Sequence, residues 1–149
     1  MSNSCQNWGK VAVLAGGCSA EREISLNSGR AVHKALCAQG VDAVLLDVDQ
    51  HIEQVLCATG VDRVFIALHG GDGENGAVQT LCERLGLPYT GSGQQACALS
   101  MDKVSSKQRW QAMALPTLPF VVLDQQRDVA LQVAHLGYPL AVKPANGGS

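Results

Sequence analysis

Val11-Ala-Val-Leu-Ala-Gly-Gly-Cys-Ser-Ala-Glu-Arg-Glu-Ile24 is the stretch of sequence that decides the fold. Its apolar residues lead into Gly16-Gly17, which is typical of a short buried strand that stops at a tight turn. Residues 24–39 follow with a helical pattern that Gly40 ends, and the apolar side of this helix holds Ile24, Ala31, Val32, Ala35 and Leu36. A buried strand followed at once by a helix predicts the first unit of an α/β fold.

The same alternation continues toward the middle of the chain. We expect strands at residues 43–47 and 63–68, helices at 52–58 and 76–85, and a short fourth strand at 88–90. Strands that alternate with helices form a mainly parallel sheet with helices on both faces. The sequence therefore predicts an N-terminal doubly wound, Rossmann-like α/β domain with a mainly parallel sheet.

Beyond Gly93 the sequence changes character. Residues 94–115 are rich in Ala, Gln, Lys, Ser and Met and predict helix, with Ser100 or Asp102 as a cap. A strand at 119–123, a helix at 125–136 and a strand at 139–143 are expected next. We place a domain boundary near residue 96, which gives domains at 1–96 and 97–149. Roughly fifty residues are few for an independent core, so we expect the second domain to be truncated.

The composition suits a folded domain and argues against several classes of partner. The chain has 149 residues, of which 46% are hydrophobic, and its net charge is -2. Its apolar runs are too short to span a membrane, and Met1–Asn7 lacks the basic and apolar regions of a signal peptide. We therefore expect a cytoplasmic protein with no membrane partner. The negative charge, with only two each of Trp, Tyr and Phe, argues against nucleic acid as a ligand.

The cysteines do not form a recognisable pattern. The 6 of them include no C-x-x-C pair and no spacing typical of a zinc site. We therefore predict reduced thiols, most of them small core residues, and no metal ligands in this chain.

The first candidate site is the turn Gly16–Glu23, where a strand is followed by a helix and where open α/β sheets bind ligands. Its glycines do not follow G-x-G-x-x-G, and Glu21 and Glu23 would repel a phosphate, so a cationic group is the better ligand. The alternative is structural: Ser19 caps the helix, and both glutamates complement the helix dipole.

The second candidate site is the loop His69–Gly76, which follows an expected strand and therefore lies at the same edge of the sheet as Glu21. Its 4 glycines permit close approach of a ligand to the backbone. His69 can position or polarise a substrate if Asp72 and Glu74 orient its ring. The alternative is a solvated histidine in a flexible loop.

The third candidate site contains two lysines. Lys143 ends an apolar run and precedes the loop Pro144–Ser149, so one ammonium, several backbone N–H groups and a hydroxyl can hold phosphate oxygens. Lys103 lies in Ser100-Met-Asp-Lys103. The alternative for both is an ordinary surface lysine, and the order of residues is not that of a P-loop.

Five segments in this order resemble the D-alanine:D-alanine ligase family of the ATP-grasp superfamily: Gly16–Glu23, His69–Glu74, Pro88–Gly93, Met101–Lys103 and Val142–Ser149. The resemblance covers nearly all of the chain after residue 9. It implies an N-terminal substrate domain at 1–96 followed by the beginning of an ATP-grasp domain. Cys18 stands where the family usually has threonine, and Asn75 where it usually has aspartate.

The resemblance also implies roles for individual residues. Glu21 matches the glutamate that holds the ammonium of the first D-alanine, and His69 matches a histidine of the same subsite. Lys103 and Lys143 match lysines that contact ATP phosphates. Ser149 matches a serine that joins the glutamate in the catalytic hydrogen-bond network and binds substrate.

The function implied is ATP-dependent ligation of two D-alanines through an acyl phosphate, for peptidoglycan precursor synthesis. ATP and Mg²⁺ (or Mn²⁺) are the implied cofactors, with metal ligands expected beyond residue 149, and a homodimer is the implied assembly. We expect the 149 residues alone to be inactive. The alternatives are a ligase with another acceptor, such as D-lactate, and a non-catalytic nucleotide- or amino-acid-binding fragment.

Overall fold

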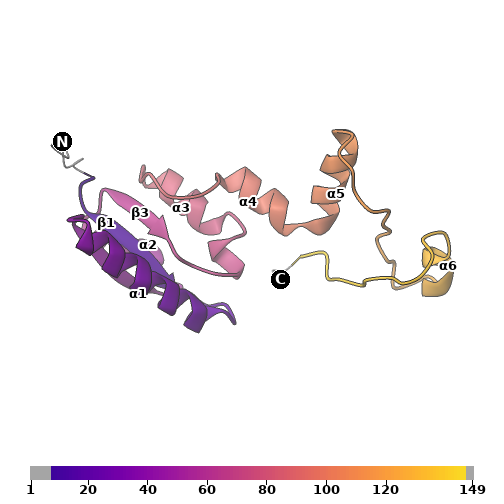
Figure 1. Ribbon diagram of the computed structural model, residues 1–149, viewed down its shortest axis with the longest axis horizontal. Coiled ribbons are helices and arrows are strands. Elements are labelled where there is room, and N and C mark those ends of the chain that lie inside the picture. Colours follow the sequence, from indigo (N-terminus) through magenta and orange to yellow (C-terminus); the bar gives the residue numbers. More distant parts are fainter. Residues whose placement is uncertain (1–7, 147–149) are drawn as a thin grey trace.

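The computed structural model describes residues 8–146, and these residues form an α/β fold. Strands and helices alternate from the first strand to the helix at Ala77–Arg84, and further helices follow it toward the C-terminus (Figure 1). In chain order the elements are β1 (Val11–Gly16), α1 (Arg22–Ala38), β2 (Ala43–Val48), α2 (Ile52–Thr59), β3 (Arg63–Ile66), the short 3₁₀ helix η1 (Gly71–Gly73), α3 (Ala77–Arg84), α4 (Gln94–Met101), α5 (Lys103–Ala112) and α6 (Val129–Val133).

The three strands form a parallel sheet in the order β2-β1-β3. In its register Val11 lies opposite Ala43 on one side and Arg63 on the other. The parallel, alternating architecture predicted from the sequence is confirmed.

The expected fourth strand at 88–90 is reduced to a single parallel bridge between Val64 and Tyr89. Two backbone hydrogen bonds form this bridge, from Val64 N–H to the carbonyl of Pro88 and from Thr90 N–H to the carbonyl of Val64. The next backbone donor, Ile66 N–H, bonds instead to the hydroxyl of Thr90 at 3.0 Å. The ladder therefore ends where a side chain takes the place of a backbone acceptor.

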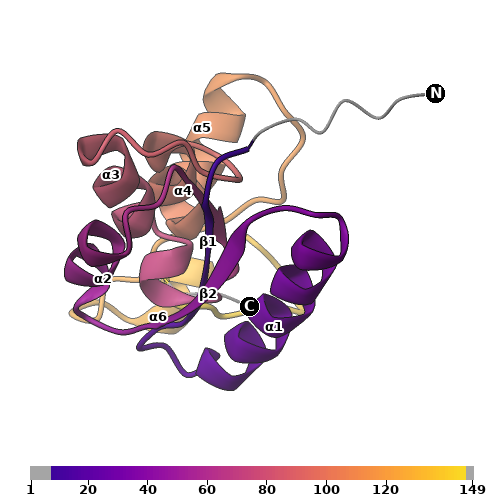
Figure 2. The ribbon, with the colours of Figure 1, turned by 90° about the vertical axis from the view of Figure 1, so that its left-hand side faces the viewer.

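Helices cover both faces of the sheet, α1 on one side and α2 with α3 on the other (Figure 2). The larger core lies under α2 and α3, because alternate strand residues point to that face. It contains the fully buried side chains of Leu14, Val48, Leu56, Val64 and Cys82. Burial raises the pKa of the Cys82 thiol to about 11, so this cysteine stays protonated at neutral pH.

The face of α1 that packs on the sheet differs from the one we predicted. Ser25, Leu26 and Gly29 are the buried residues of this helix, whereas Ile24 is 56% exposed and Ala31 and Ala35 are also exposed. The helix approaches β1 so closely that a Cβ at position 29 would overlap the Cβ of Ala15. Small and hydroxyl-bearing residues therefore form the contact in place of the large apolar ones that periodicity favours.

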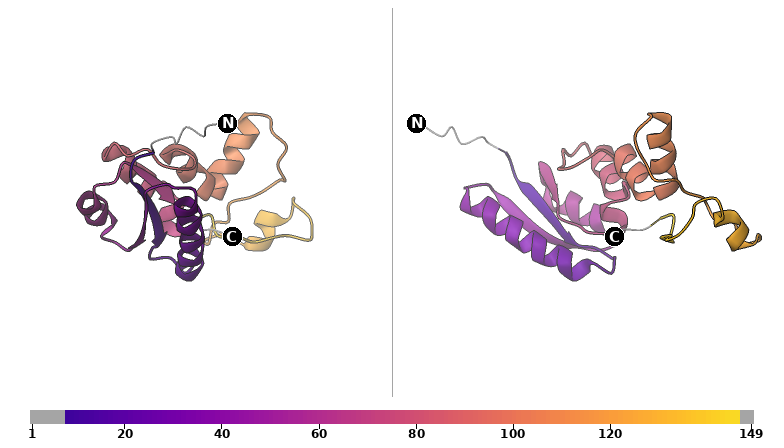
Figure 3. Two further views of the ribbon diagram at one scale, coloured as in Figure 1. Left: turned by 60° about the vertical axis from the view of Figure 1, so that its left-hand side comes forward. Right: turned by 45° about the vertical axis from the view of Figure 1, so that its right-hand side comes forward.

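Two helices form where a single one was expected between residues 94 and 115. Asp102 has extended backbone between α4 and α5, and its carboxylate accepts a hydrogen bond from Ser105 N–H at 2.8 Å. The predicted capping role of Asp102 is thus confirmed, although the cap opens a second helix inside the expected one. Both helices follow α3 and stand between the sheet and α6 (Figure 3). Residue 96 lies within α4, and the domain division near it remains a prediction.

The two strands expected at 119–123 and 139–143 are not formed. Both segments run without a backbone partner among residues 8–146, and a strand needs one. Their apolar side chains are correspondingly exposed: Val142 is 80% exposed, Val122 56% and Leu123 36%. Apolar runs in this part of the sequence therefore do not build a core within the described residues.

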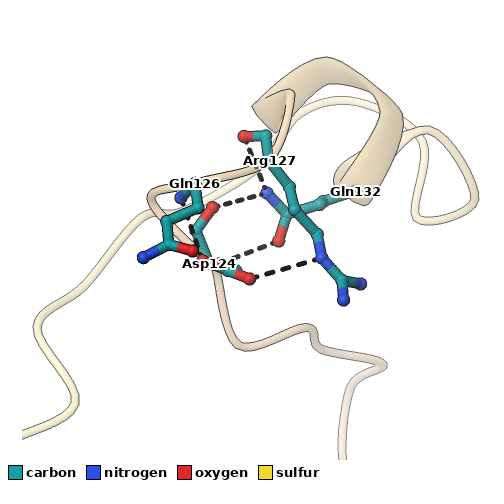
Figure 4. Close-up of polar contacts among 4 residues, drawn as sticks. All are labelled: Asp124, Gln126, Arg127 and Gln132. Carbon is teal, nitrogen blue, oxygen red and sulfur yellow. Dashed lines mark hydrogen bonds and ion pairs between the residues drawn. The ribbon is translucent and has the colours of Figure 1, made fainter.

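The helix expected at 125–136 is shortened to α6, which Asp128 caps by accepting hydrogen bonds from Ala130 N–H and Leu131 N–H. The residues before it form a tight polar loop instead (Figure 4). The side chain of Gln132 accepts from Asp124 N–H at 2.8 Å and donates to the Asp124 carbonyl at 2.9 Å, which closes the loop.

The cysteines differ in burial from what the sequence predicted. Among residues 8–146 the cysteines are all unpaired, as expected, but only Cys82 is buried, so the prediction that most are core residues is wrong. Cys18, Cys37 and Cys57 are exposed.

No helix in the described part of the chain is long and apolar enough to cross a membrane.

Substitution of Gly29 by alanine should destabilise the fold. Alanine favours helix over glycine by about 1 kcal/mol, but its methyl would meet Ala15 on the rigid strand β1, and overpacking costs about 1–3 kcal/mol. We expect Gly29→Ala to lower the urea midpoint of unfolding, and Ala15→Gly in the same chain to recover part of the loss. A Gly29→Ala chain at least as stable as the parent would contradict the close approach of α1 to β1.

Candidate functional site

The candidate site lies at the carboxyl edge of the sheet, between the ends of β1 and β3. The chain leaves β1 toward α1 on one face and leaves β3 toward α3 on the other (Figure 2). Such a divergence, with neighbouring strands whose connections run to opposite faces, is where open parallel sheets bind ligands. Glu21 follows β1 and His69 follows β3, so the two predicted residues lie on the two sides of this divergence.

Ser25 holds the ends of β1 and β3 together at the point where their ladder stops. The last backbone bond runs from Ala67 N–H to the carbonyl of Leu14. Beyond it the Ser25 hydroxyl accepts from Gly16 N–H at 2.9 Å and donates to the carbonyl of Ala67 at 2.7 Å. Ser25 is 0% exposed, so its hydroxyl satisfies two backbone groups that water cannot reach.

Ser19 joins the two loops that border the site. Its hydroxyl donates to the carbonyl of His69 at 2.6 Å and accepts from Glu21 N–H at 3.1 Å. Glu21 itself occupies the N-cap position of α1, and no side chain caps this helix. The helix-capping alternative for Ser19 is therefore wrong, because its hydroxyl links loop to loop instead.

The carboxylate of Glu21 lies against the backbone of the second loop. Gly70 has a positive φ of 63°, and a Cβ there would stand 2.5 Å from Oε2 of Glu21. Glu21 is half-buried, and among residues 8–146 its carboxylate has neither a hydrogen bond nor an ion pair. A half-buried carboxylate without a partner is unfavourable, and a cationic ligand would relieve that cost.

His69 is held by α1 and not by its own loop. Its Nε2 lies 3.0 Å from the hydroxyl of Ser28, whereas the carboxylate of Asp72 accepts a hydrogen bond from Asn75 Nδ2 at 3.1 Å. The expectation that Asp72 orients the histidine ring is therefore wrong. The sequence signal that could have found Ser28 is spacing: Glu21, Ser25 and Ser28 lie at i, i+4 and i+7, on one side of a helix.

Arg22 does not neutralise the site, because it points to β2. Its Nη2 pairs with Oδ2 of Asp47 at 2.8 Å, and its Nη1 donates to the carbonyl of Gly17 at 3.3 Å. The hydrogen bond that the Arg22 guanidinium donates to Asp47 raises the pKa of Arg22. Arg22, the cation next to Glu21 in sequence, therefore pairs with Asp47 and does not neutralise the Glu21 carboxylate.

Backbone pairing joins the two segments that carry the predicted lysines. Lys103 N–H donates to the carbonyl of Ala145 at 2.9 Å, and Asp102 and Asn146 form an antiparallel bridge. Lys143, which is exposed, stands two residues before Ala145 and therefore lies on the segment that pairs with the start of α5. Ser149 lies outside the described residues.

No cluster of three or more His, Cys, Asp or Glu side chains that could hold a metal ion is present in residues 8–146. The residues at hand therefore do not fit a metal site by themselves. The chemistry at the divergence of β1 and β3 rests on the half-buried imidazole of His69 and on the carboxylate of Glu21, which has no hydrogen bond or ion pair among residues 8–146.

A parallel α/β sheet with polar groups at the divergence of two strands is the arrangement at which open sheets of this class bind small molecules. Comparison with known proteins shows what the chain is similar to. Residues 53–92 match the family model described as D-ala D-ala ligase N-terminus. The D-alanine–D-alanine ligases of Nitrosococcus oceani and Pseudomonas entomophila are 54% and 52% identical to the chain over 142 residues. In sequence and fold, the chain is similar to the N-terminal portion of these D-alanine–D-alanine ligases.

Solved structures agree with the sequence comparisons. The crystal structure of D-alanine–D-alanine ligase from Bacillus anthracis complexed with ATP matches 93% of the chain with a TM-score of 0.84 and 31% identity. The chain covers 48% of that structure, 45% of the Nitrosococcus oceani relative and 45% of the Pseudomonas entomophila relative. It thus spans about half the length of the relatives it matches.

Substitution of Ser25 by alanine should destabilise the chain through the two backbone groups it leaves without partners. Each unsatisfied buried group costs about 1–3 kcal/mol. We expect Ser25→Ala to lower the free energy of unfolding by at least that amount in urea titrations followed by circular dichroism. Ser105→Ala, a helix serine whose hydroxyl forms no hydrogen bond within residues 8–146, should change it by about 0.5 kcal/mol or less. Equal losses for both variants would contradict the bridging role of Ser25.

Proposed function

We propose that the chain supplies the first D-alanine site and part of the ATP site of an ATP-dependent D-alanine–D-alanine ligase. The reaction joins two D-alanines through an acyl phosphate and supplies peptidoglycan precursors. The observation that carries the proposal is the half-buried carboxylate of Glu21, which has no partner among residues 8–146 and lies against the loop that follows His69. It lies on a chain that is 54% identical over 142 residues to a D-alanine–D-alanine ligase.

Glu21 suits the ammonium group of an amino acid. Its carboxylate lies at the start of α1 against Gly70, at the divergence of β1 and β3 where open sheets bind small ligands. An ion pair at this point fixes the orientation of the amino acid, so that its own carboxylate can face a phosphoryl donor. We propose that His69, on the opposite loop, contacts the other end of the same molecule; the bond from Ser19 to its carbonyl supports this by tying the two loops together.

Lys103 and Lys143 suit the phosphates of ATP. The backbone bond from Lys103 to Ala145 joins the two segments that carry these ammonium groups, and two point charges from separate segments match a polyphosphate. Phosphoryl transfer to a carboxylate brings two anions together, and cations offset their repulsion. Ser149, next to this segment in sequence, is proposed to bind substrate with Glu21.

Mg²⁺ or Mn²⁺ would neutralise part of the phosphate charge in this reaction. Residues 8–146 hold no cluster of side chains suited to such an ion, so we assign none of them as a metal ligand. We propose that the metal ligands come from the half of the ligase that the chain does not span. The family resemblance also supports a homodimer, and the use of ATP supports a cytoplasmic location.

Removal of the negative charge at position 21 should weaken D-alanine binding. In an active ligase that contains this segment, we expect Glu21→Gln to raise the D-alanine concentration for half-saturation about tenfold or more, because a hydrogen bond to a charged group contributes about 1.5–3 kcal/mol. Binding of ATP should be nearly unchanged. Glu23→Gln is the matched control, since Glu23 is exposed in the first turn of the same helix. An equal loss of ATP affinity in Glu21→Gln would place Glu21 outside the amino-acid site.

Removal of the ammonium at position 143 should affect ATP. In the same ligase we expect Lys143→Ala to raise the Michaelis constant for ATP and lower the rate, with a combined loss of about ten- to a hundredfold. Lys143→Arg should recover little, because a planar fork does not reproduce a point charge. Steady-state kinetics with varied ATP at saturating D-alanine measure this, with exposed Lys34→Ala on α1 as control. If Lys143→Ala left the Michaelis constant for ATP and the rate unchanged, Lys143 would be an ordinary surface lysine with no role in ATP binding.

A further inference from the structure

We propose that Ser28 is a positioning residue that orients the imidazole of His69 and selects its tautomer. The inference rests on the proposed function, because it concerns the same amino-acid site. The Ser28 hydroxyl lies 3.0 Å from Nε2 of His69, and both side chains are half-buried. The backbone of His69 is held separately, by the hydroxyl of Ser19 on its carbonyl. One serine thus fixes the chain at His69, and a second serine fixes the ring.

The direction of this hydrogen bond follows from what else the hydroxyl can reach. The Ser28 hydroxyl forms a hydrogen bond with Nε2 of His69. Among residues 8–146 this hydroxyl has no second hydrogen-bond partner. If Nε2 carried the proton, the hydroxyl would accept it and its own proton would have no protein acceptor. The favoured arrangement therefore has the hydroxyl donating to Nε2, which places the ring proton on Nδ1.

This tautomer suits an anionic group of the ligand. A neutral imidazole with its proton on Nδ1 offers a donor there, and Nδ1 has no hydrogen-bond partner in the described part of the chain. Glu21 across the divergence offers only acceptors. The two loops then present a cation site at Glu21 and a hydrogen-bond donor at His69, which matches the two ends of an amino-acid zwitterion.

Ser28 can be changed without removing support from the backbone. Ser25 and Ser19 bond to the carbonyls of Ala67 and His69, so their loss disturbs the main chain. The hydroxyl of Ser28 contacts only a side chain in the described residues. Ser28→Ala should therefore leave the fold intact and alter the His69 ring, which separates a positioning role from a structural one.

The tautomer can be measured on the 149-residue chain itself. Long-range ¹H–¹⁵N spectra should show the His69 ring with its proton mainly on Nδ1. We expect Ser28→Ala to shift the ring toward the Nε2-protonated form, and Ser28→Thr, which keeps a hydroxyl, to restore it. Ser105→Ala is the matched control on α5, and the spectrum of His33, whose Nε2 contacts the Ala43 carbonyl, should not change. A His69 ring that is the same in Ser28→Ala and in the parent would overturn the inference.

A second measurement connects the ring to substrate. In an active ligase that contains this segment, Ser28→Ala should raise the Michaelis constant for D-alanine about five- to tenfold, leave that for ATP unchanged, and be rescued by Ser28→Thr. If Ser28→Ala shifted the His69 tautomer but left the Michaelis constant for D-alanine unchanged, the role of Ser28 toward the substrate would be overturned. Weaker D-alanine binding in Glu21→Gln would still support the proposed function in that case. If Glu21→Gln also left D-alanine binding unchanged, the proposed function itself would fail.

Discussion

The site depends on one buried hydroxyl, that of Ser25, which bonds to both β1 and β3 where their ladder ends. A parallel ladder cannot continue past this point, because the two strands turn to opposite faces of the sheet. The hydroxyl satisfies one donor and one acceptor that the divergence would otherwise leave unpaired. The strands can therefore separate early enough to leave a place for a ligand, without the cost of orphaned backbone groups.

Three serines extend this arrangement into the candidate functional site. Ser19, Ser25 and Ser28 all come from the β1–α1 unit, and all three bond to residues that follow β3. They hold Glu21 and His69 on facing loops, while the Arg22–Asp47 pair keeps the neighbouring cation at the end of β2. The negative charge of Glu21 is thus left without a protein partner among the described residues, which is what recognition of an ammonium group requires.

The second half of the chain is organised by backbone contacts in place of a core. Asp102 caps α5, and its neighbour Lys103 pairs with Ala145, so the two lysine segments meet although the apolar runs around them stay exposed. The strands expected at 119–123 and 139–143 fail for a physical reason: an extended segment is stable in a sheet only beside a partner. Local pattern identifies a segment that can be extended, but it does not provide the neighbour.

The sequence alone determined the α/β alternation and the parallel sheet, and it narrowed the helix cap to Ser100 or Asp102, because these features depend on local spacing. It also predicted, from charge, that Glu21 binds a cation, and this assignment stays a prediction. The sequence did not determine which side of α1 is buried. It also predicted that Asp72 orients the His69 ring, whereas in the structure the ring bonds to Ser28. Those features were decided by tertiary structure, because the approach of α1 to β1 at Gly29 and Ala15 sets which residues meet the end of β3. Contacts between segments more than forty residues apart, such as Ser28 with His69, arise only when the sheet brings the two loops to one edge.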